Sequence, residues 1–165
     1  MWENECMGII GIDPGLSGAV ALLQDDLLQV FDMPTVEVRG RRQIVPSLLA
    51  GVLRHQVDMV VIEHVQGVQG TGATSAFSFG RSFGLAEGLA TGLGLPVTLV
   101  RPQAWTKALG VSRDKGEHRA IAARLWPRHA DLFARVKDDG RADAALLCHW
   151  WRLHSRAAFG RLTDT

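Results

Sequence analysis

The stretch that decides the fold is MGIIGIDPGLSGAVALL, residues 7–23. An apolar run from Met7 to Ile12 leads into Asp13, a Pro-Gly turn follows, and a second apolar run spans residues 19–23. Short apolar runs bounded by Gly and Pro are typical of buried strands. The pattern therefore predicts two neighbouring strands, the first of which delivers the carboxylate of Asp13 to the edge of a sheet.

The same arrangement recurs fifty residues further along the chain. Val57 to Ile62 is a continuous apolar run that leads into Glu63 and then into a loop rich in Gly and Gln, residues 65–72. Neighbouring strands lie about 4.8 Å apart. If these two strands pair, the carboxylates of Asp13 and Glu63 can share a divalent metal ion.

The remaining patterns place these strands in a mixed α/β arrangement. We expect strands at residues 27–31 and 96–100, an exposed loop at 39–42, and helices at 44–55, 74–93, 102–110, 115–125 and from Asp138 or Asp139 onward. Three strands, a helix and then a strand favour a mixed sheet over a doubly wound one. The helix at 74–93 is expected to start with a Thr or Ser cap and to carry Gly80, Gly84, Gly88 and Gly92 on one face, which another element can approach closely.

Composition limits the class of protein. With 165 residues, 47% hydrophobic and 21% charged, we expect one globular domain over residues 1–165 with a core at about 7–157. Apolar runs fall short of the ~20 residues of a membrane span, and no export signal is evident, so we expect a cytoplasmic protein with no membrane partner. Cys6 and Cys148 are expected to be reduced thiols, the latter in the core.

The net charge of +1 conceals an uneven distribution. Residues 1–100 contain 5 basic and 10 acidic side chains, whereas residues 101–165 contain 13 basic and 7 acidic ones, so the two parts carry −5 and +6. A basic region beside a carboxylate cluster suits a polyanionic substrate. The alternative is an ordinary solvated helical surface.

A third acidic position lies at the start of the last helix. Asp139 and Asp143 are four residues apart and project from nearly the same helical face, where like charges repel unless a cation or other positive groups compensate. Asp138 or Asp139 could instead cap the helix. Asp143 lies one turn inside, between apolar residues, where an unpaired carboxylate is costly.

Five stretches together resemble the RuvC-type Holliday junction resolvases, most closely their phage and phage-like branch. They are GIDPG at 11–15, VIE at 61–63, FSFGRSFG at 77–84, PQAW at 102–105 and KDDGRADA at 137–144. They span most of the chain and follow the order of that family. The resemblance implies a ribonuclease H-like fold, with a five-stranded mixed sheet flanked by helices. It also implies a homodimer that presents one active site to each of two opposed strands of a four-way DNA junction, in a bacterial or phage-infected cell.

The same resemblance implies the catalytic residues. Asp13, Glu63, Asp139 and Asp143 are expected to bind two Mg²⁺ ions, with Mn²⁺ able to substitute, and Lys115 to lie near the cleaved phosphate. The assignment of Asp139 depends on a spacing of four to Asp143, and Asp138 is its rival. Two such ions activate an attacking water and stabilise the leaving oxygen. The implied products carry 5′-phosphate and 3′-hydroxyl ends.

Residues that contact DNA are expected after the Gly/Gln loop. Phe77 and Phe79 can stack on bases unpaired at the crossover, although both cannot lie on one helical face, and Arg81 can meet a phosphate. Any of these phenylalanines could equally belong to the core or to a dimer interface. Lys107 and Lys115 are further DNA-binding candidates, with an ordinary solvated side chain as the alternative for each.

Other residues and other functions carry less weight. His64 and His149 are interpreted as structural, and Trp105 chiefly as a packing residue. An actin-like kinase or ATPase is disfavoured because a domain of 165 residues has no room for a second lobe. Two alternatives stay open: a ribonuclease H-like nuclease acting on another branched DNA or RNA, and a non-catalytic junction-binding protein.

Overall fold

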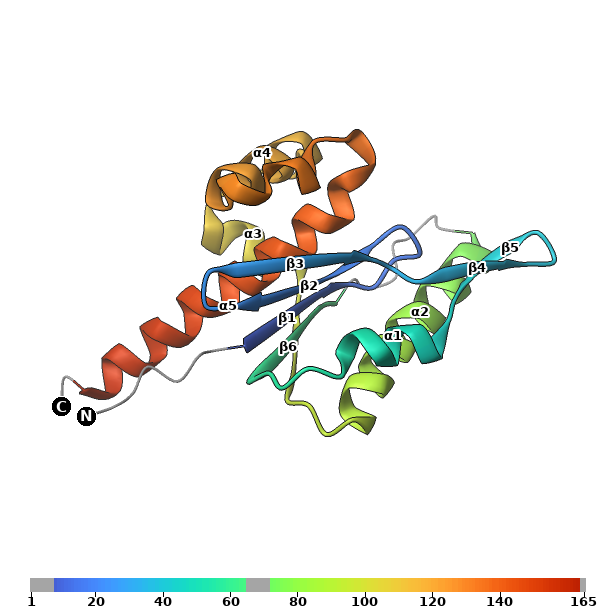
Figure 1. The fold of residues 1–165 in the computed structure, drawn as a ribbon, viewed down its shortest axis with the longest axis horizontal. Helices are drawn as coiled ribbons and strands as arrows, with labels where there is room; N and C mark the ends of the chain where they lie inside the picture. The colour runs from blue at the N-terminus through green and yellow to red at the C-terminus, as the bar shows by residue number, and fades with distance from the viewer. Residues whose placement is uncertain (1–7, 65–71, 164–165) are drawn as a thin grey trace.

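The computed structural model describes the backbone of residues 8–64 and 72–163 and the side chains up to Ser155. Its centre is a five-stranded sheet in the order β3-β2-β1-β6-β7 (Figure 1). The strands are β1 (Gly8–Asp13), β2 (Ala19–Gln24), β3 (Leu27–Asp32), β6 (Met59–Glu63) and β7 (Val97–Val100). β1, β2 and β3 form an antiparallel meander, while β6 runs parallel to both β1 and β7. The predicted mixed sheet is confirmed.

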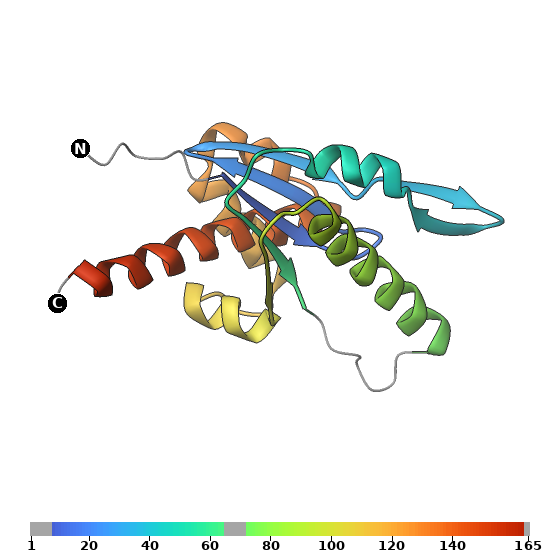
Figure 2. The ribbon, with the colours of Figure 1, turned by 90° about the horizontal axis from the view of Figure 1, so that it is seen from below.

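Helices cover both faces of the sheet (Figures 1 and 2). One face packs on α1 (Pro46–Leu53) and α2 (Ala73–Gly92), the other on α3 (Pro102–Leu109), α4 (Lys115–Leu125) and α5 (Asp139–Thr163). Two 3₁₀ helices, η1 (Pro127–Phe133) and η2 (Val136–Asp138), connect α4 to α5. Along β1, Ile10 and Ile12 belong to the first core and Ile9 to the second, which explains why the strand is apolar at every position.

The last helix lies in direct backbone contact with the first strand. A Cβ added at Gly11 of β1 would lie only 2.1 Å from the carbonyl oxygen of Ala144. Ala142, Ala144 and Ala145 are fully buried in the same contact layer. Small residues on both elements therefore let α5 begin close above the end of β1, and this position determines where its acidic residues lie.

A β-hairpin replaces the loop expected at residues 39–42. β4 (Thr35–Val38) pairs with β5 (Arg41–Ile44), and the hairpin projects from the body of the molecule (Figure 1). Its two turn residues, Arg39 and Gly40, have φ of 52° and 74°, as the tight turns that match strand twist require. The prediction of a helix from residue 44 was also wrong at its start, because Ile44 ends β5 and is buried as a strand residue.

The start and one face of α2 differ from expectation. Its N-cap residue is Gly72 and no side chain caps it, so the predicted Thr or Ser cap is wrong. Gly80, Gly84, Gly88 and Gly92 are exposed, and a Cβ at any of them would meet no other element of the described chain within 4 Å. This glycine face is therefore open in the single chain.

Two sequence expectations concern the core and the membrane. Cys148 is fully buried, as predicted, and burial raises the pKa of its thiol to about 12. Cys6 lies outside the described residues. Within the described residues, no helix has the length and apolar character needed to cross a membrane.

Candidate active site

Parallel pairing of β1 and β6 brings Asp13 and Glu63 together. Ile12 lies opposite Ile62 in the register, so the acids that follow them stand side by side where both strands end. The condition for a shared metal ion, the pairing of these two strands, is therefore met. Glu63 is also opposite Val100 of β7 and only 7% exposed. Both carboxylates are thus fixed at the ends of two largely buried strands.

The turn after β1 and the start of α5 together hold Asp13. The backbone N–H of Gly15 donates a hydrogen bond to Asp13 Oδ1 (3.2 Å). A Cβ at Gly140 would lie 3.1 Å from Asp13 Oδ2 and 2.7 Å from the carbonyl oxygen of Ser17. Glycine at position 140 therefore lets the first turn of α5 pack against this carboxylate.

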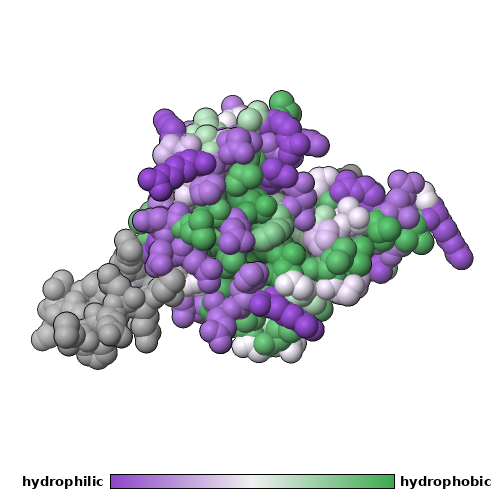
Figure 3. Space-filling model, in the orientation of Figure 1, coloured by the Kyte–Doolittle hydropathy of each residue, from purple (hydrophilic) through white to green (hydrophobic). Residues whose placement is uncertain are grey.

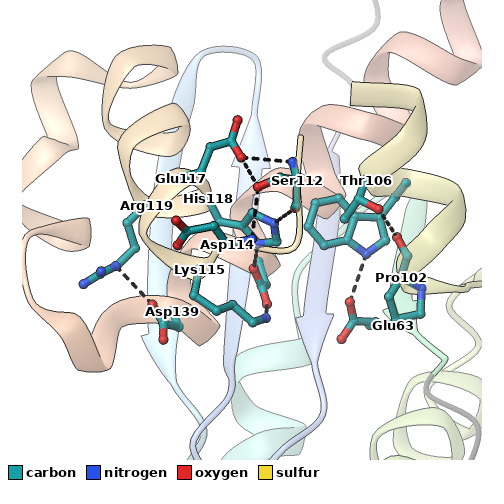
Figure 4. A network of polar contacts seen from close by, with 12 residues as sticks. Glu63, Pro102, Thr106, Ser112, Asp114, Lys115, Glu117, His118, Arg119 and Asp139 are labelled. Carbon is teal, nitrogen blue, oxygen red and sulfur yellow. Dashed lines mark hydrogen bonds and ion pairs between the residues drawn. The ribbon is translucent and has the colours of Figure 1, made fainter. Parts of the chain in front are cut away.

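Glu63 is oriented by Trp105 of α3. The indole Nε1–H donates to Glu63 Oε1 at 2.9 Å, drawn as the dashed line to the labelled Glu63 in Figure 4. The Trp105 side chain is fully buried. A buried indole N–H needs an acceptor, so the packing role inferred from the sequence is incomplete. Trp105 also directs one oxygen of the neighbouring acid.

Asp143 extends from α5 into the same region and is met by two side chains of α4. The Lys115 ammonium pairs with Asp143 Oδ2, and His118 Nδ1 lies 2.6 Å from Oδ1. His118 Nε2 donates to the carbonyl oxygen of Ser112 at 2.8 Å, and the hydrogen bond between Nδ1 and Asp143 raises the pKa of the imidazole, so the protonated ring donates from both nitrogens. The sequence interpretation missed His118. Its spacing of three from Lys115 was the available signal, because such residues share a helical face.

The cluster holds more negative charge than its cations balance. Burial, and then the charge of Asp143, raise the pKa of Asp13 to about 6. Burial, and then the charge of Asp13, raise the pKa of Glu63 to about 7 even though Trp105 hydrogen-bonds it. Burial lowers the pKa of Lys115, but Asp143 and the other two acids outweigh this effect and the net pKa is raised. The carboxylates of Asp13 and Glu63 therefore retain their protons to higher pH than ordinary acids do, because neither of them is paired with a cation in the part of the chain that the structure describes.

The other two acids near α5 have arginine partners. Asp139 Oδ1 lies 3.0 Å from Arg119 Nε of α4 (Figure 4). Asp138 accepts the backbone N–H of Arg135 at 2.8 Å and also binds its guanidinium, so its carboxylate caps the short helix η2, whereas the sequence pattern indicated a cap of the last helix. Asp139 and Asp143 do share a face, as predicted, and α4 supplies the compensating positive groups.

The donor set can be tested for a metal ion. Within residues 8–64 and 72–163, no three His, Cys, Asp or Glu side chains are arranged to ligate one ion as they stand. Both oxygens of Asp143 already contact Lys115 and His118. Asp13 and Glu63 nevertheless offer carboxylate oxygens, which hard divalent cations prefer, at a point of excess negative charge. The donor chemistry of Asp13 and Glu63 therefore fits a hard divalent cation.

The predicted DNA contacts lie at the surface or are half-buried, and none of them belongs to the two core clusters. Phe77 is 74% exposed, and Phe79 is half-buried. Arg81 donates to Gln43 Oε1 of β5 at 3.0 Å, and Lys107 is exposed on α3. The Gly/Gln loop at 65–71 lies outside the described residues.

The two histidines interpreted as structural both pack against aromatic rings. His64 stacks on Phe83 with ring centroids 5.2 Å apart, and His149 meets the edge or face of Trp126 at 6.0 Å. Neither contact involves the carboxylate cluster.

Comparison with solved structures identifies the fold. Thermus thermophilus RuvC in complex with a Holliday junction substrate superposes with a TM-score of 0.64 at 17% identity, covering 92% of this chain and 96% of that one. Another structure of Thermus thermophilus RuvC gives 0.60 at 16% identity, covering 90% and 97%. The yeast mitochondrial Holliday junction resolvase Ydc2 gives 0.52 at 16% identity, covering 88% and 78%. No protein-family model and no curated protein matches the sequence. The chain thus has the ribonuclease H-like fold of these proteins.

Proposed function

We propose that this chain is a divalent-metal-dependent endonuclease that resolves Holliday junctions and other branched DNA by paired nicks. The observation that carries the proposal is that Asp13, Glu63 and Asp143 lie close together where β1 and β6 end, with Asp143 contributed by α5. The pKa of Asp13 responds to the charge of Asp143, and that of Glu63 to both other acids. The shared fold of Holliday junction resolvases supports the choice of substrate.

Asp13, Glu63 and Asp143 would hold the metal. Bound Mg²⁺, or Mn²⁺ in its place, supplies a lowered pKa for an attacking water and charge stabilisation for the leaving 3′ oxygen, with two ions per site. The role of Asp139 as a fourth ligand is predicted from the sequence alone. In the structure its carboxylate faces Arg119. His118 and Trp105 would fix the orientations of Asp143 and Glu63 respectively.

The basic residues near the cluster would hold the scissile phosphate. Lys115 and Arg113 line a cavity of about 270 Å³ that also reaches Glu63 and Trp105. A phosphodiester entering there meets positive charge and the carboxylate cluster together. Lys107 lies on the exposed side of α3 and would contact DNA farther from the cleaved bond. At the crossover, Phe77 or Phe79 would stack on an unpaired base, and Arg81 would contact a phosphate.

The open glycine face of α2 supports a homodimer. Gly80, Gly84, Gly88 and Gly92 lie four apart and have no Cβ to separate two helices, so a second copy can approach closely. A dimer would present one active site to each of two opposed strands. Membership in the phage-like branch and a cytoplasmic location also remain predictions from the sequence.

The test is cleavage of a synthetic four-way junction beside matched duplex, flap and RNA substrates, in Mg²⁺, Mn²⁺ or EDTA. We expect symmetrical paired nicks with 5′-phosphate ends on the junction and none in EDTA. Cutting of flaps or RNA alone would transfer the activity to another branched substrate. Binding with no cutting would favour the non-catalytic alternative, which the existing pairing of Asp143 with Lys115 and His118 makes worth testing.

A further inference from the structure

A second binding surface lies between the β4–β5 hairpin and the first turns of α2. It is an open groove of about 680 Å³, called here the hairpin groove. The residues on which the argument depends are Ser17, Arg41, Arg42, Gln43, Phe77 and Arg81. The sequence had indicated only an exposed loop at this position, so the groove is a product of the hairpin.

The hairpin groove concentrates positive charge in the acidic part of the chain. Residues 1–100 contain five basic side chains, and three of them, Arg41, Arg42 and Arg81, line the groove. No acidic residue is found among those described as lining the groove. Arg81 donates to the neutral amide of Gln43, which leaves its charge uncompensated. The groove therefore suits a polyanion.

One arginine joins the hairpin to the active-site turn. Arg42 donates to Ser17 Oγ at 3.1 Å and to Thr35 Oγ1 at 3.3 Å, and it also binds the carbonyl oxygen of Leu16. The carbonyl oxygen of Ser17 and Asp13 Oδ2 both pack against Gly140. The inner end of the groove is therefore adjacent to the catalytic carboxylates, and Arg42 holds the two regions in register.

Exposed apolar surface accompanies the arginines. Phe77 is 74% exposed at the groove, while Val36 and Val38 are 47% and 43% exposed. Val38 pairs with Arg41 across the hairpin and so shares its face. Figure 3 shows the projecting hairpin with hydrophobic surface next to a hydrophilic tip. An aromatic ring beside unpaired guanidinium groups is the combination that binds single nucleic-acid strands.

We propose that the hairpin groove carries a strand of junction DNA away from the active site. Its phosphates contact Arg41 and Arg81, and a base unpaired at the crossover stacks on Phe77. Arg42 positions the hairpin and does not bind the strand. This inference rests on the proposed function, because the strand that enters the groove is the one that leaves the carboxylate cluster.

The first test removes one charge and measures salt dependence. Arg41→Gln is compared with Arg54→Gln, a matched control at the exposed end of α1, outside the groove. Junction affinity is measured by fluorescence anisotropy in EDTA over a range of KCl concentrations. We expect Arg41→Gln to weaken binding and reduce the slope of log K against log salt by about 1, the loss of about one phosphate contact, with Arg54→Gln unchanged. Equal slopes for the two variants would overturn the groove assignment.

The second test addresses the ring. Phe77→Leu keeps an apolar side chain but removes the aromatic face, and a 2-aminopurine at the crossover reports stacking. We expect the wild-type protein to quench this base and Phe77→Leu to lose the quenching, with affinity lower by at least about fivefold. Unchanged quenching would contradict stacking. A wild-type protein that does not bind junctions would refute the proposed function itself, whereas normal wild-type binding with silent Arg41 and Phe77 variants would refute only the groove.

Discussion

Asp13 and Glu63, at the ends of β1 and β6, differ from the acids at the start of α5 in what surrounds their charge. The strand-end acids have pKa values raised to about 6 and about 7 because burial, and then the charge of Asp143 on Asp13 and of Asp13 on Glu63, outweigh their hydrogen bonds. Asp138 and Asp139 are instead paired with Arg135 and Arg119.

The difference shows which acids the fold has left for an external cation. An ion pair inside the protein satisfies a carboxylate and removes most of its need for a metal. Asp143 lies between the two classes, since it faces the cluster but is held by Lys115 and His118. Four predictions test or sharpen this comparison.

The largest effect is expected at the strand ends. Asp13→Asn or Glu63→Gln should lower junction cleavage at least about 1,000-fold, because each removes a charged ligand worth several kcal/mol in the transition state. Junction binding in EDTA should stay near wild type, since neither carboxylate donates a hydrogen bond to a DNA phosphate. Glu87→Gln, on α2, is the matched control. Near-normal cleavage by either site variant would sink the assignment of the metal site.

A smaller effect should separate the two acids on α5. Asp143→Asn should reduce cleavage nearly as much as Asp13→Asn, whereas Asp139→Asn should cost about 10-fold, as outer residues of metal sites do. The reason is the Arg119 partner, which already compensates Asp139. Single-turnover rates at saturating Mg²⁺ measure both. Equal losses would restore Asp139 to the ligand set that the sequence predicts.

The third prediction concerns stability and pH. The folded-state pKa values of Asp13 and Glu63 exceed their ordinary values of 3.8 and 4.5. The folded protein therefore retains protons that the unfolded chain has released, and these two groups make the free energy of unfolding fall as pH rises from about 4 to about 7.

A divalent ion binds the deprotonated form and should offset this loss. At a metal concentration about 100-fold above its Kd, we expect a Tm increase of about 5–10 °C at pH 8 and much less at pH 5. Thermal melts with and without Mg²⁺ measure it, with Asp13→Asn as the control that loses the increase. The same increase at both pH values would show that the ion binds elsewhere.

The sequence predicted those parts of the site that lie on continuous local patterns. The apolar runs before Asp13 and Glu63 indicated two buried strands, whereas their pairing was only a condition of the predicted metal site and is given by the structure. The spacing of Asp139 and Asp143 correctly placed both on one helical face. Each of these inferences needs only the period of a strand or a helix.

The residues that the sequence missed depend on contacts between distant elements. His118 and Trp105 reach Asp143 and Glu63 only because α4 and α3 pack over the sheet edge, which no local period encodes. The β4–β5 hairpin was missed for another reason. Its strands are only four residues long and largely exposed, and although β4 (TVEV) alternates polar and apolar residues, β5 (RRQI) does not, so its adjacent arginines resemble a loop.

The smallest effect is expected on the pH dependence of cleavage, through the cation inside the cluster. The charge of Lys115 lowers the pKa of both Asp13 and Glu63, although burial has the larger, opposite influence on each. Lys115→Met should therefore raise both pKa values further and move the acid limb of the cleavage-rate profile to higher pH, by under about one unit. Lys107→Met, on the exposed side of α3, is the matched control and should leave that limb in place. An acid limb that is the same in both variants would mean that the protons lost there do not come from the strand-end acids, and the contrast between these acids and those of α5 would lose its electrostatic basis.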